Sequence, residues 1–414
     1  MFLALVITSL IAEPPAGQDD VFMYGKIVTV DEKSYEGPIR WGREEVYWVD
    51  LFNAAKQENE NLRYLSERDR ERLDAQQNDS WISMSDNVAR WVSGRFSNHR
   101  RDYTHQFTCQ FGDIKSIRPT GSQRAEIELR NGTRVEVDGE GYNDVGNDIV
   151  ILDKELGEVT LRWNRIEKVE FMKTPSALPG KFGEPLYGTV EAFGKKVSGY
   201  IQWDHDERLS TDKLDGESED GKLSIEFGKI RSIEKKGGRS IVELKSGRRF
   251  EMSGSNDVAK GHRGVIVMNR DFPAFDIPWS EFDKVTFSDN ADGDLLTFSD
   301  YKNPKELNAR VKTRDGSTLS GRLIFDLDEA YDFELLQGKE GEFEYTIPFR
   351  SIKKITAKGS RRSVVELVGG KTVTLDDAQD VGDRNQGLLI FPGKERSSTY
   401  IPWAEVESIE MTQL

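Results

Sequence analysis

The sequence predicts an all-β protein built from internal repeats, with one helical insertion. A thirteen-residue phrase with a central tryptophan occurs three times in the chain. The copies are VTLRWNRIEKVEF (159–171), FDIPWSEFDKVTF (275–287) and TYIPWAEVESIEM (399–411). Side chains alternate between apolar and polar before the tryptophan, which is typical of a strand. Recurrence at this spacing indicates tandem copies of one structural unit.

Aligning the three phrases divides the chain. We expect a first repeat over 21–172, a second over 187–288 and a third over 308–414. Two segments rich in Pro, Gly and polar residues, 173–186 and 289–307, serve as linkers between them. The first repeat is longer because it contains the insertion.

Each repeat divides again into two similar halves. The second halves open with a strand, a tight turn and another strand, as in IELRNGTRVEV, VELKSGRRFEM and VELVGGKTVTL. The turns are at Asn131-Gly132, Ser246-Gly247 and Gly369-Gly370, where glycine accepts the positive φ of a hairpin turn. The halves therefore predict six modules of about 50 residues.

All six modules close on an aromatic residue followed by apolar residues three and six positions later. Phenylalanine closes the first halves at positions 111, 227 and 349, and tryptophan closes the second halves at positions 163, 279 and 403. A step of three fits one turn of 3₁₀ helix between two strands. We expect each ring to be buried in its own module; the alternative is a tryptophan that stacks on a ligand.

This strand, 3₁₀ turn and strand pattern resembles that of SH3-like and Sm-like small barrels, over nearly the whole chain. Tandem modules of this kind resemble those of uncharacterised exported bacterial proteins. The resemblance implies six small barrels, paired within three repeats, and a role in binding other polymers, and it implies no catalytic residue. A six-bladed β-propeller is the alternative fold.

Composition excludes some classes of function. The 414-residue chain has a formal net charge of −15, which argues against nucleic-acid binding and against adhesion to anionic lipid. The first twelve residues, MFLALVITSLIA, are too few to cross a bilayer and resemble the apolar region of a secretory signal, so we expect residues 1–20 to direct export to the periplasm or the medium. An apolar terminal strand is the alternative. Cys109 is the only cysteine and reads as a small core residue.

An acidic loop follows the second strand of the second repeat, DHDERLSTDKLDGESED (204–220). Clustered carboxylates suit calcium, which makes Asp204, Asp206, Asp212 and Asp215 weak candidates for a calcium site. The simpler interpretation is a solvated acidic face. The sequence predicts no other metal site and no cofactor.

In the first repeat the equivalent loop grows into the insertion, about 50–105. Ser66 is expected to be the N-cap of a first helix in the insertion. A second helix is expected to begin at about Ser85. Its aromatic and basic residues suit a carboxylate, a phosphate or an acidic partner. The candidates for partner binding are Trp91, Arg95, Arg100 and Arg101. The alternative is that the insertion only covers a barrel.

Another recurrence lies in the second halves, where Asp144, Asp257 and Asp380 each precede a valine. Aspartate beside asparagine and glycine favours a local Asx turn. A contact with a shared ion or peptide is the alternative.

The sequence holds no recognisable catalytic motif, since its four histidines lack metal-ligand spacing. We therefore expect an exported, non-enzymatic interaction protein that binds another envelope protein or a peptide through the insertion and the barrel loops. A structural, self-associating spacer is the alternative, and the sequence is compatible with a homo-oligomer. A calcium-binding or hydrolytic protein is a minor alternative.

Overall fold

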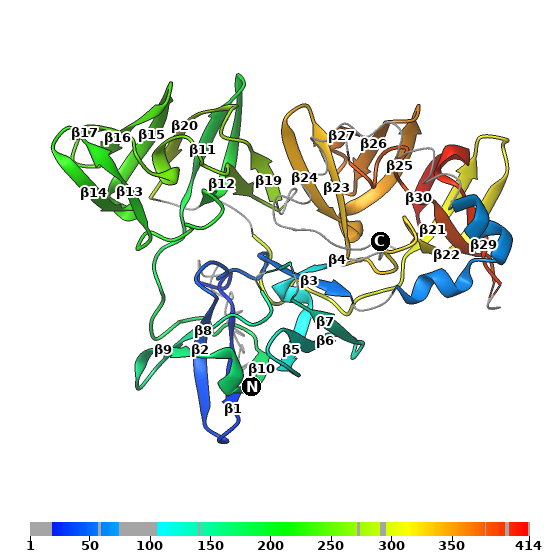
Figure 1. The fold of residues 1–414 in the computed structure, drawn as a ribbon, viewed down its shortest axis with the longest axis horizontal. Coiled ribbons are helices and arrows are strands. Elements are labelled where there is room, and N and C mark those ends of the chain that lie inside the picture. Colours follow the sequence, from blue (N-terminus) through cyan, green and yellow to red (C-terminus); the bar gives the residue numbers. More distant parts are fainter. Residues whose placement is uncertain are drawn as a thin grey trace, which may run out of the picture.

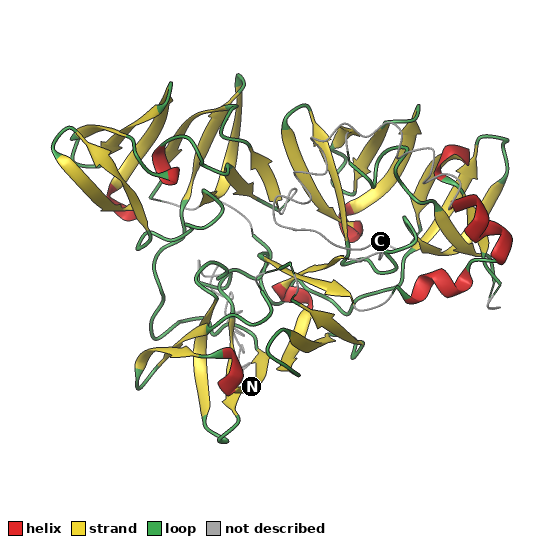
Figure 2. Cartoon of the chain, viewed as in Figure 1, coloured by secondary structure: helices red, strands yellow, loops and turns green. Residues whose placement is uncertain are grey.

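The protein is all-β in the part that the computed structural model describes (Figures 1 and 2). That part comprises residues 19–56, 59–73, 106–139, 141–142, 144–270, 274–289, 295–376, 378–393 and 397–412. It contains thirty strands and one α-helix, at 67–73.

The strands fall into three units of ten, which form three lobes in Figure 1. Unit 1 comprises β1 (Tyr24–Thr29), β2 (Ser34–Trp41), β3 (Leu51–Lys56), β4 (Gln106–Gln110), β5 (Ile114–Pro119), β6 (Arg124–Leu129), β7 (Arg134–Asp138), β8 (Ile149–Asp153), β9 (Gly157–Leu161) and β10 (Ile166–Phe171). Unit 2 comprises β11 (Tyr187–Ala192), β12 (Lys195–Trp203), β13 (Lys213–Ser218), β14 (Gly221–Glu226), β15 (Ile230–Lys236), β16 (Arg239–Leu244), β17 (Arg249–Met252), β18 (Val265–Met268), β19 (Ala274–Ile277) and β20 (Phe282–Phe287). Unit 3 comprises β21 (Asn308–Thr313), β22 (Thr318–Ile324), β23 (Leu335–Glu340), β24 (Phe343–Pro348), β25 (Ile352–Lys358), β26 (Arg362–Leu367), β27 (Thr372–Asp376), β28 (Leu388–Phe391), β29 (Thr399–Ile401) and β30 (Val406–Met411).

Equivalent strands pair in the same way in each unit. Unit 1 is one sheet in the order β4-β3-β7-β6-β5-β10-β1-β2-β8-β9. The equivalent pairs of unit 3 are all present, as in β22–β28 and β25–β30. Unit 2 differs in one respect: β13 and β14 form a separate hairpin, joined to the chain after β17 by a bridge between Glu217 and Ser253. Units 2 and 3 are joined by pairing of β19 with β24, and together form an eighteen-stranded sheet.

The two halves of a unit exchange strands, and the sheets are not closed barrels. In unit 1, β2 pairs with β8 of the second half, and β7 pairs with β3 of the first half. The exchange of strands arises at the connection between the second and the third strand of each unit. In unit 1 this connection begins with a bridge between Trp41 and Glu45 and carries the chain away from β2. The described strands also form three sheets, not the six of a propeller.

The aromatic corners are confirmed. Five of the six expected positions begin a 3₁₀ turn: η2 (Phe111–Asp113), η3 (Trp163–Arg165), η4 (Phe227–Lys229), η6 (Phe349–Ser351) and η7 (Trp403–Glu405). The aromatic ring of each is buried. At the sixth position Trp279 lies in an ordinary turn and is only half-buried, stacked on His262. The hairpin glycines Gly132, Gly247 and Gly370 have φ between 85° and 87°, as the turn type requires.

Apolar contacts hold the units together. Units 2 and 3 share one core, whereas unit 1 has its own core, which also contains Tyr301 and Phe333. The second linker packs on unit 1, with Phe298 edge-on to Trp48. Gly112 lies under Tyr301: a Cβ at this position would be 2.2 Å from the tyrosine ring. The second linker is therefore a packed part of the structure.

The insertion begins later than expected, because residues 51–56 form β3, the equivalent of β13 and β23. After it come η1 (Glu60–Tyr64) and the helix at 67–73. Ser66 is the N-cap, as predicted: its Oγ accepts a hydrogen bond from the Asp69 amide (3.2 Å). The remainder of the insertion, 74–105, lies outside the described residues.

Candidate functional site

The loops that follow β2, β12 and β22 share one construction. Each begins with an aromatic residue that bridges to a glutamate four positions later, as Trp203 does to Glu207. Each ends with an acid whose carboxylate accepts two backbone N–H groups of the loop. Asp212 Oδ2, for example, accepts from Arg208 and Leu209, both at 2.9 Å. The other two terminal acids are Asp50 and Glu334.

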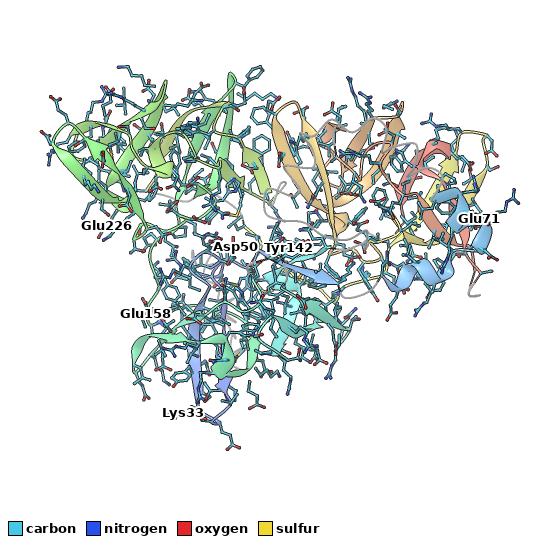
Figure 3. All side chains as sticks on the ribbon, viewed as in Figure 1. Lys33, Asp50, Glu71, Tyr142, Glu158 and Glu226 are labelled. Atoms are coloured by element: carbon cyan, nitrogen blue, oxygen red, sulfur yellow. The ribbon has the colours of Figure 1, made fainter. Side chains whose placement is uncertain are left out.

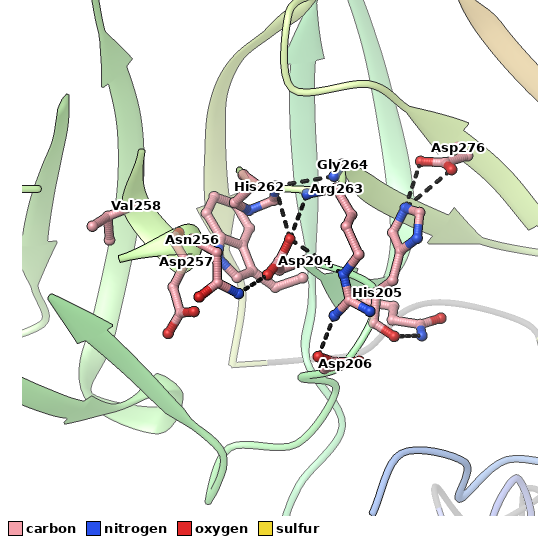
Figure 4. A network of polar contacts seen from close by, with 12 residues as sticks. Asp204, His205, Asp206, Asn256, Asp257, Val258, His262, Arg263, Gly264 and Asp276 are labelled. Atoms are coloured by element: carbon pink, nitrogen blue, oxygen red, sulfur yellow. Dashed lines mark hydrogen bonds and ion pairs between the residues drawn. The ribbon is translucent and has the colours of Figure 1, made fainter. Parts of the chain in front are cut away.

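A second acid ties the loop to the segment before the eighth strand of the unit (Figure 4). Asp204 accepts hydrogen bonds from Asn256 Nδ2 and from the Arg263 amide. Asp204 has φ 47°, a left-handed conformation that a non-glycine residue rarely adopts. Asp326 repeats the arrangement in unit 3, also with φ 47° and with Gln379 and Gln386 as donors. These carboxylate contacts hold the strained turn.

The recurring aspartates Asp144, Asp257 and Asp380 do not make the expected Asx turns. Each carboxylate instead accepts a backbone N–H from the third strand of its unit. The donors are Asn53 (2.6 Å), Asp215 (2.7 Å) and Gln337 (2.6 Å). These aspartates anchor the exchanged strand to the loop before the eighth strand.

The main-chain carbonyl of the same aspartate also has a donor in every unit. In units 1 and 2 the donor is an indole N–H: Trp41 to Asp144 (2.8 Å) and Trp203 to Asp257 (2.9 Å). Unit 3 has Phe325 at this position, which has no N–H. Asn385 Nδ2 donates to the Asp380 carbonyl instead (3.0 Å). The main-chain carbonyl of this aspartate thus accepts a buried hydrogen bond in all three units, from a tryptophan in two of them and from an asparagine in the third.

Replacing Trp203 by phenylalanine tests this bond. We expect a loss of about 1–2 kcal/mol in the free energy of unfolding, because the Asp257 carbonyl loses its buried donor. Denaturation by urea measures the loss. Phe325→Trp is the matched control, since the Asp380 carbonyl already has a donor, and we expect it to bring no gain. An equal stability of Trp203→Phe and the wild type would contradict the assignment.

Buried carboxyl groups gather behind these loops. Burial, together with the charge of Asp257, raises the pKa of Glu207 to about 8. Burial also raises the pKa values of Glu45 and Glu329 well above the usual range, with the charges of Asp144 and Asp380 adding to the effect. His262 shows the opposite shift: burial lowers its pKa to about 3. Its Nδ1 accepts the Gly264 amide (3.0 Å), so the ring is neutral and carries its proton on Nε2.

Because the pKa of Glu207 is raised, its contribution to the free energy of unfolding should fall as the pH rises from 4.5 to about 8. The pKa of Glu207 in the folded chain exceeds its unfolded value of 4.5, so its contribution is complete below pH 4.5 and is lost as pH rises through 8. His262 opposes this trend below about pH 7.5, where the unfolded imidazole is still partly protonated, but its effect is the same in Glu207→Gln and in the wild type. We expect Glu207→Gln to flatten the decline in unfolding free energy between pH 6.5 and 8.5. Glu219→Gln, at an exposed position, is the control, and its unfolding free energy should change with pH as that of the wild type does. If Glu207→Gln also shows the pH dependence of the wild type, the raised pKa of Glu207 is contradicted.

The terminal acids of the loops also join the units. Arg208 Nη1 of unit 2 lies 2.8 Å from Asp50 Oδ2 of unit 1. Arg40 of unit 1 makes the reciprocal contact with Asp212 of unit 2 (3.0 Å). Figure 3 shows Asp50 in the middle of the molecule, between the lobes. Tyr47 Oη completes this junction by donating to the Arg208 carbonyl (3.0 Å).

Units 1 and 3 are joined by similar contacts. Lys56 Nζ lies 2.9 Å from both Asp328 and Glu334. Burial alone would lower the pKa of Lys56, but these two carboxylates raise it overall. Arg350 forms a two-pronged contact with Asp113, at 2.5 Å and 2.9 Å. Sequence reasoning missed all of these cations, because none of them recurs between the repeats.

The described part of the insertion covers unit 3. Leu65 and Leu73 are buried among apolar residues of that unit, and Tyr64 is edge-on to Phe391 (5.0 Å). Asn59 and Asn61 donate to main-chain carbonyls of the loop after β22. This portion is structural cover. The partner candidates Trp91, Arg95, Arg100 and Arg101 lie outside the described residues.

The calcium candidates do not converge on one point. Asp204 is buried and bonded within unit 2, whereas Asp212 caps its own loop and contacts Arg40. Asp206 pairs with Arg263, and the Asp215 side chain is exposed on β13. No group of three or more His, Cys, Asp or Glu residues suited to a metal ion occurs in the described ranges.

Comparisons with protein-family models, with curated proteins and with solved structures found no match to this chain. Within the residues that the structure describes, no helix has both the length and the apolar character needed to cross a membrane.

Proposed function

We propose that the protein is an exported, non-enzymatic interaction protein that binds another protein or a peptide through an exposed loop on a rigid scaffold. The observation that carries the proposal is Phe193. It lies in the two-residue turn between β11 and β12, where Ala192 pairs with Lys195. Its side chain is 72% exposed and its φ is 48°.

Both properties of Phe193 are unfavourable for the isolated chain. A phenylalanine with positive φ is strained, by roughly 1–3 kcal/mol. Asparagine or aspartate before glycine is the usual choice for such a turn. An exposed aromatic residue is, however, the type of side chain that anchors protein interfaces. Its presence at a costly position favours a binding role.

The scaffold supports this role. The buried ion pair Arg208–Asp50 and the partly buried pair Arg350–Asp113 fix the three units relative to one another, so their loops are held in place. Rigid presentation lowers the entropy lost on binding. The apolar stretch at residues 1–12 supports export. Trp91, Arg95, Arg100 and Arg101 remain candidates for a second contact.

The barrel interpretation is part of the proposal. Each unit has short antiparallel strands, and a 3₁₀ corner precedes the fifth strand of every half except the second half of unit 2. The resemblance to SH3-like and Sm-like barrels implies such corners. We interpret a unit as two such modules that have exchanged their third and fourth strands. The alternative function, a self-associating spacer, is favoured by one observation: β19 of unit 2 pairs with β24 of unit 3, so these units join edge to edge.

Phe193→Asn tests the binding role. It places Asn-Gly in the turn, and we expect the free energy of unfolding to rise by about 1 kcal/mol because the strain is relieved. We also expect loss of the partner that a photo-crosslinking residue on the β11–β12 turn captures in the native cell. Val368→Asn, an exposed apolar residue in another turn, is the control and should keep the partner. Undiminished capture by Phe193→Asn would contradict the proposal.

A further inference from the structure

One sheet edge in this chain is already occupied by another unit. The outer strand β19 of unit 2 pairs antiparallel with the outer strand β24 of unit 3, in the register Ala274↔Thr346, Phe275↔Tyr345 and Asp276↔Glu344. Phe275 and Tyr345 pack across the pair with ring centroids 4.9 Å apart. The carboxylates opposite each other, Asp276 and Glu344, each have a separate basic partner, His205 and Lys339. The ninth strand of one unit therefore fits the fourth strand of another.

Four equivalent strands pair with a single neighbour among the described residues: the ninth strands β9 and β29, and the fourth strands β4 and β14. Phe107 of β4 is buried against Phe333 of unit 3, so this edge lies beside another unit. The edges considered below are β9, the counterpart of β19, and β14, the counterpart of β24. Figure 3 shows Glu158 of β9 and Glu226 of β14 on the same side of the molecule. Leu156, in the turn that leads into β9, is 67% exposed. Unpaired edges of this kind are ready to add a strand.

β29, the ninth strand of unit 3, is less accessible to a further strand than β9. Tyr400 of β29 is buried among residues that include Leu65 and Leu73 of the insertion. Arg72 lies over the Tyr400 ring, and Ser398 donates to the Tyr64 carbonyl. The insertion therefore covers β29, while β9 lacks such a cover within the described ranges.

We propose that β9 of one copy of this chain pairs with β14 of a second copy, in the register of β19 and β24. Superposing the aromatic corners places Val159 opposite Leu223, where Phe275 faces Tyr345. Both side chains are only half-buried and would become covered. A cross-strand apolar pair of this type stabilises a ladder by roughly 0.2–1 kcal/mol beyond its hydrogen bonds.

Charge favours the same register. Thr160 falls opposite Lys222, so the like-charged contact found between Asp276 and Glu344 is absent. Glu158, opposite Ser224, is diagonal to Lys222, within reach of a long side chain. The Lys222 side chain is 88% exposed, and its contact with Glu217 is long, at 3.9 Å, so it can turn toward Glu158. Since each copy carries both edges, the contact can close into a two-fold dimer or continue as a chain of copies.

The mass of the full-length chain tests the proposal. Sedimentation equilibrium over a range of concentrations should show association of the wild type. Ser224→Pro should abolish it. The two-residue turn after Ser218 is closed by the pair Ser218 and Gly221, which exchange backbone hydrogen bonds. Hydrogen-bonded and non-hydrogen-bonded pairs alternate along an antiparallel ladder, so the pair Asp215 and Ser224 is not hydrogen-bonded. The backbone N–H of Ser224 therefore points away from β13. Proline there removes a donor from the open edge alone.

A charge exchange keeps the test independent of that proline. Glu158→Lys and Lys222→Glu should each weaken association several-fold, and the double variant should restore it. Both residues are exposed, so folding should be unaffected. A wild type that stays monomeric, or association that survives Ser224→Pro in a folded chain, would overturn the proposal. Neither result bears on capture at Phe193, which belongs to a different turn.

Discussion

Replacing Arg208 by methionine should lower the free energy of unfolding by about 3–5 kcal/mol, because it leaves a buried carboxylate without its counter-charge. The side chains of Arg208 and Asp50 are 1% and 2% exposed. Asp50 also accepts the Val46 and Tyr47 amides, so it cannot turn toward solvent without breaking its own loop. Denaturation followed by tryptophan fluorescence measures the change, since Trp41 and Trp48 flank this loop.

Lys196→Met is the matched control for Arg208→Met. Lys196 and Glu191 form a pair of similar length, 2.9 Å, but their side chains are 67% and 38% exposed. Water screens such a pair, and its loss should cost less than about 1 kcal/mol. Asp50→Asn combined with Arg208→Met should cost less than the sum of the single changes, because the unpaired charge disappears. Equal costs for Arg208→Met and Lys196→Met would show that Arg208 is not holding the units together.

Local features of this fold were predictable from the sequence. The ring at Phe111, the glycine at Gly132 and the N-cap at Ser66 each act within a few residues of chain. Steric demands on such short segments are the same wherever the segment is placed. That is why the hairpin turns and five of the six 3₁₀ corners could be predicted correctly from the sequence.

Pairing between distant strands was not predictable in the same way. Nothing in the alternation of β2 distinguishes β8 as its partner from β3, because both candidates present apolar residues at every second position. The exchange depends on the conformation of residues 42–50, where Asp50 and Glu45 organise the loop. The cations that join the units, Arg208, Lys56 and Arg350, occur once each, so comparing the repeats could not identify them.

The aspartates before valine show an intermediate case. Their recurrence indicated a shared role, but a local turn was the wrong interpretation. The carboxylate of Asp257 reaches the Asp215 amide, 42 residues earlier in the chain. A recurring acid can therefore signal a contact between strands as well as a turn, and only the pairing of strands decides between the two.

Phe227→Ala should be among the most damaging single changes in unit 2, with an expected loss of about 3–5 kcal/mol. Phe227 begins η4, is 1% exposed, and contacts Trp203 and Phe287 with ring centroids 6.2 Å and 5.8 Å apart. Removing its ring leaves a cavity in the core that units 2 and 3 share. Urea denaturation of the full chain measures the loss.

Trp279→Ala is the contrasting variant, because Trp279 occupies the same corner position in the second half of unit 2 and has a larger ring. Its side chain is only half-buried, and Lys235 covers the exposed part from 5.6 Å. If burial rather than ring size governs stability at these corners, Trp279→Ala should cost clearly less than Phe227→Ala. A larger loss for Trp279→Ala would mean that its stack with His262 contributes more to unit 2 than the buried phenylalanine. The role of the corner rings as the internal seals of each unit would then have to be abandoned.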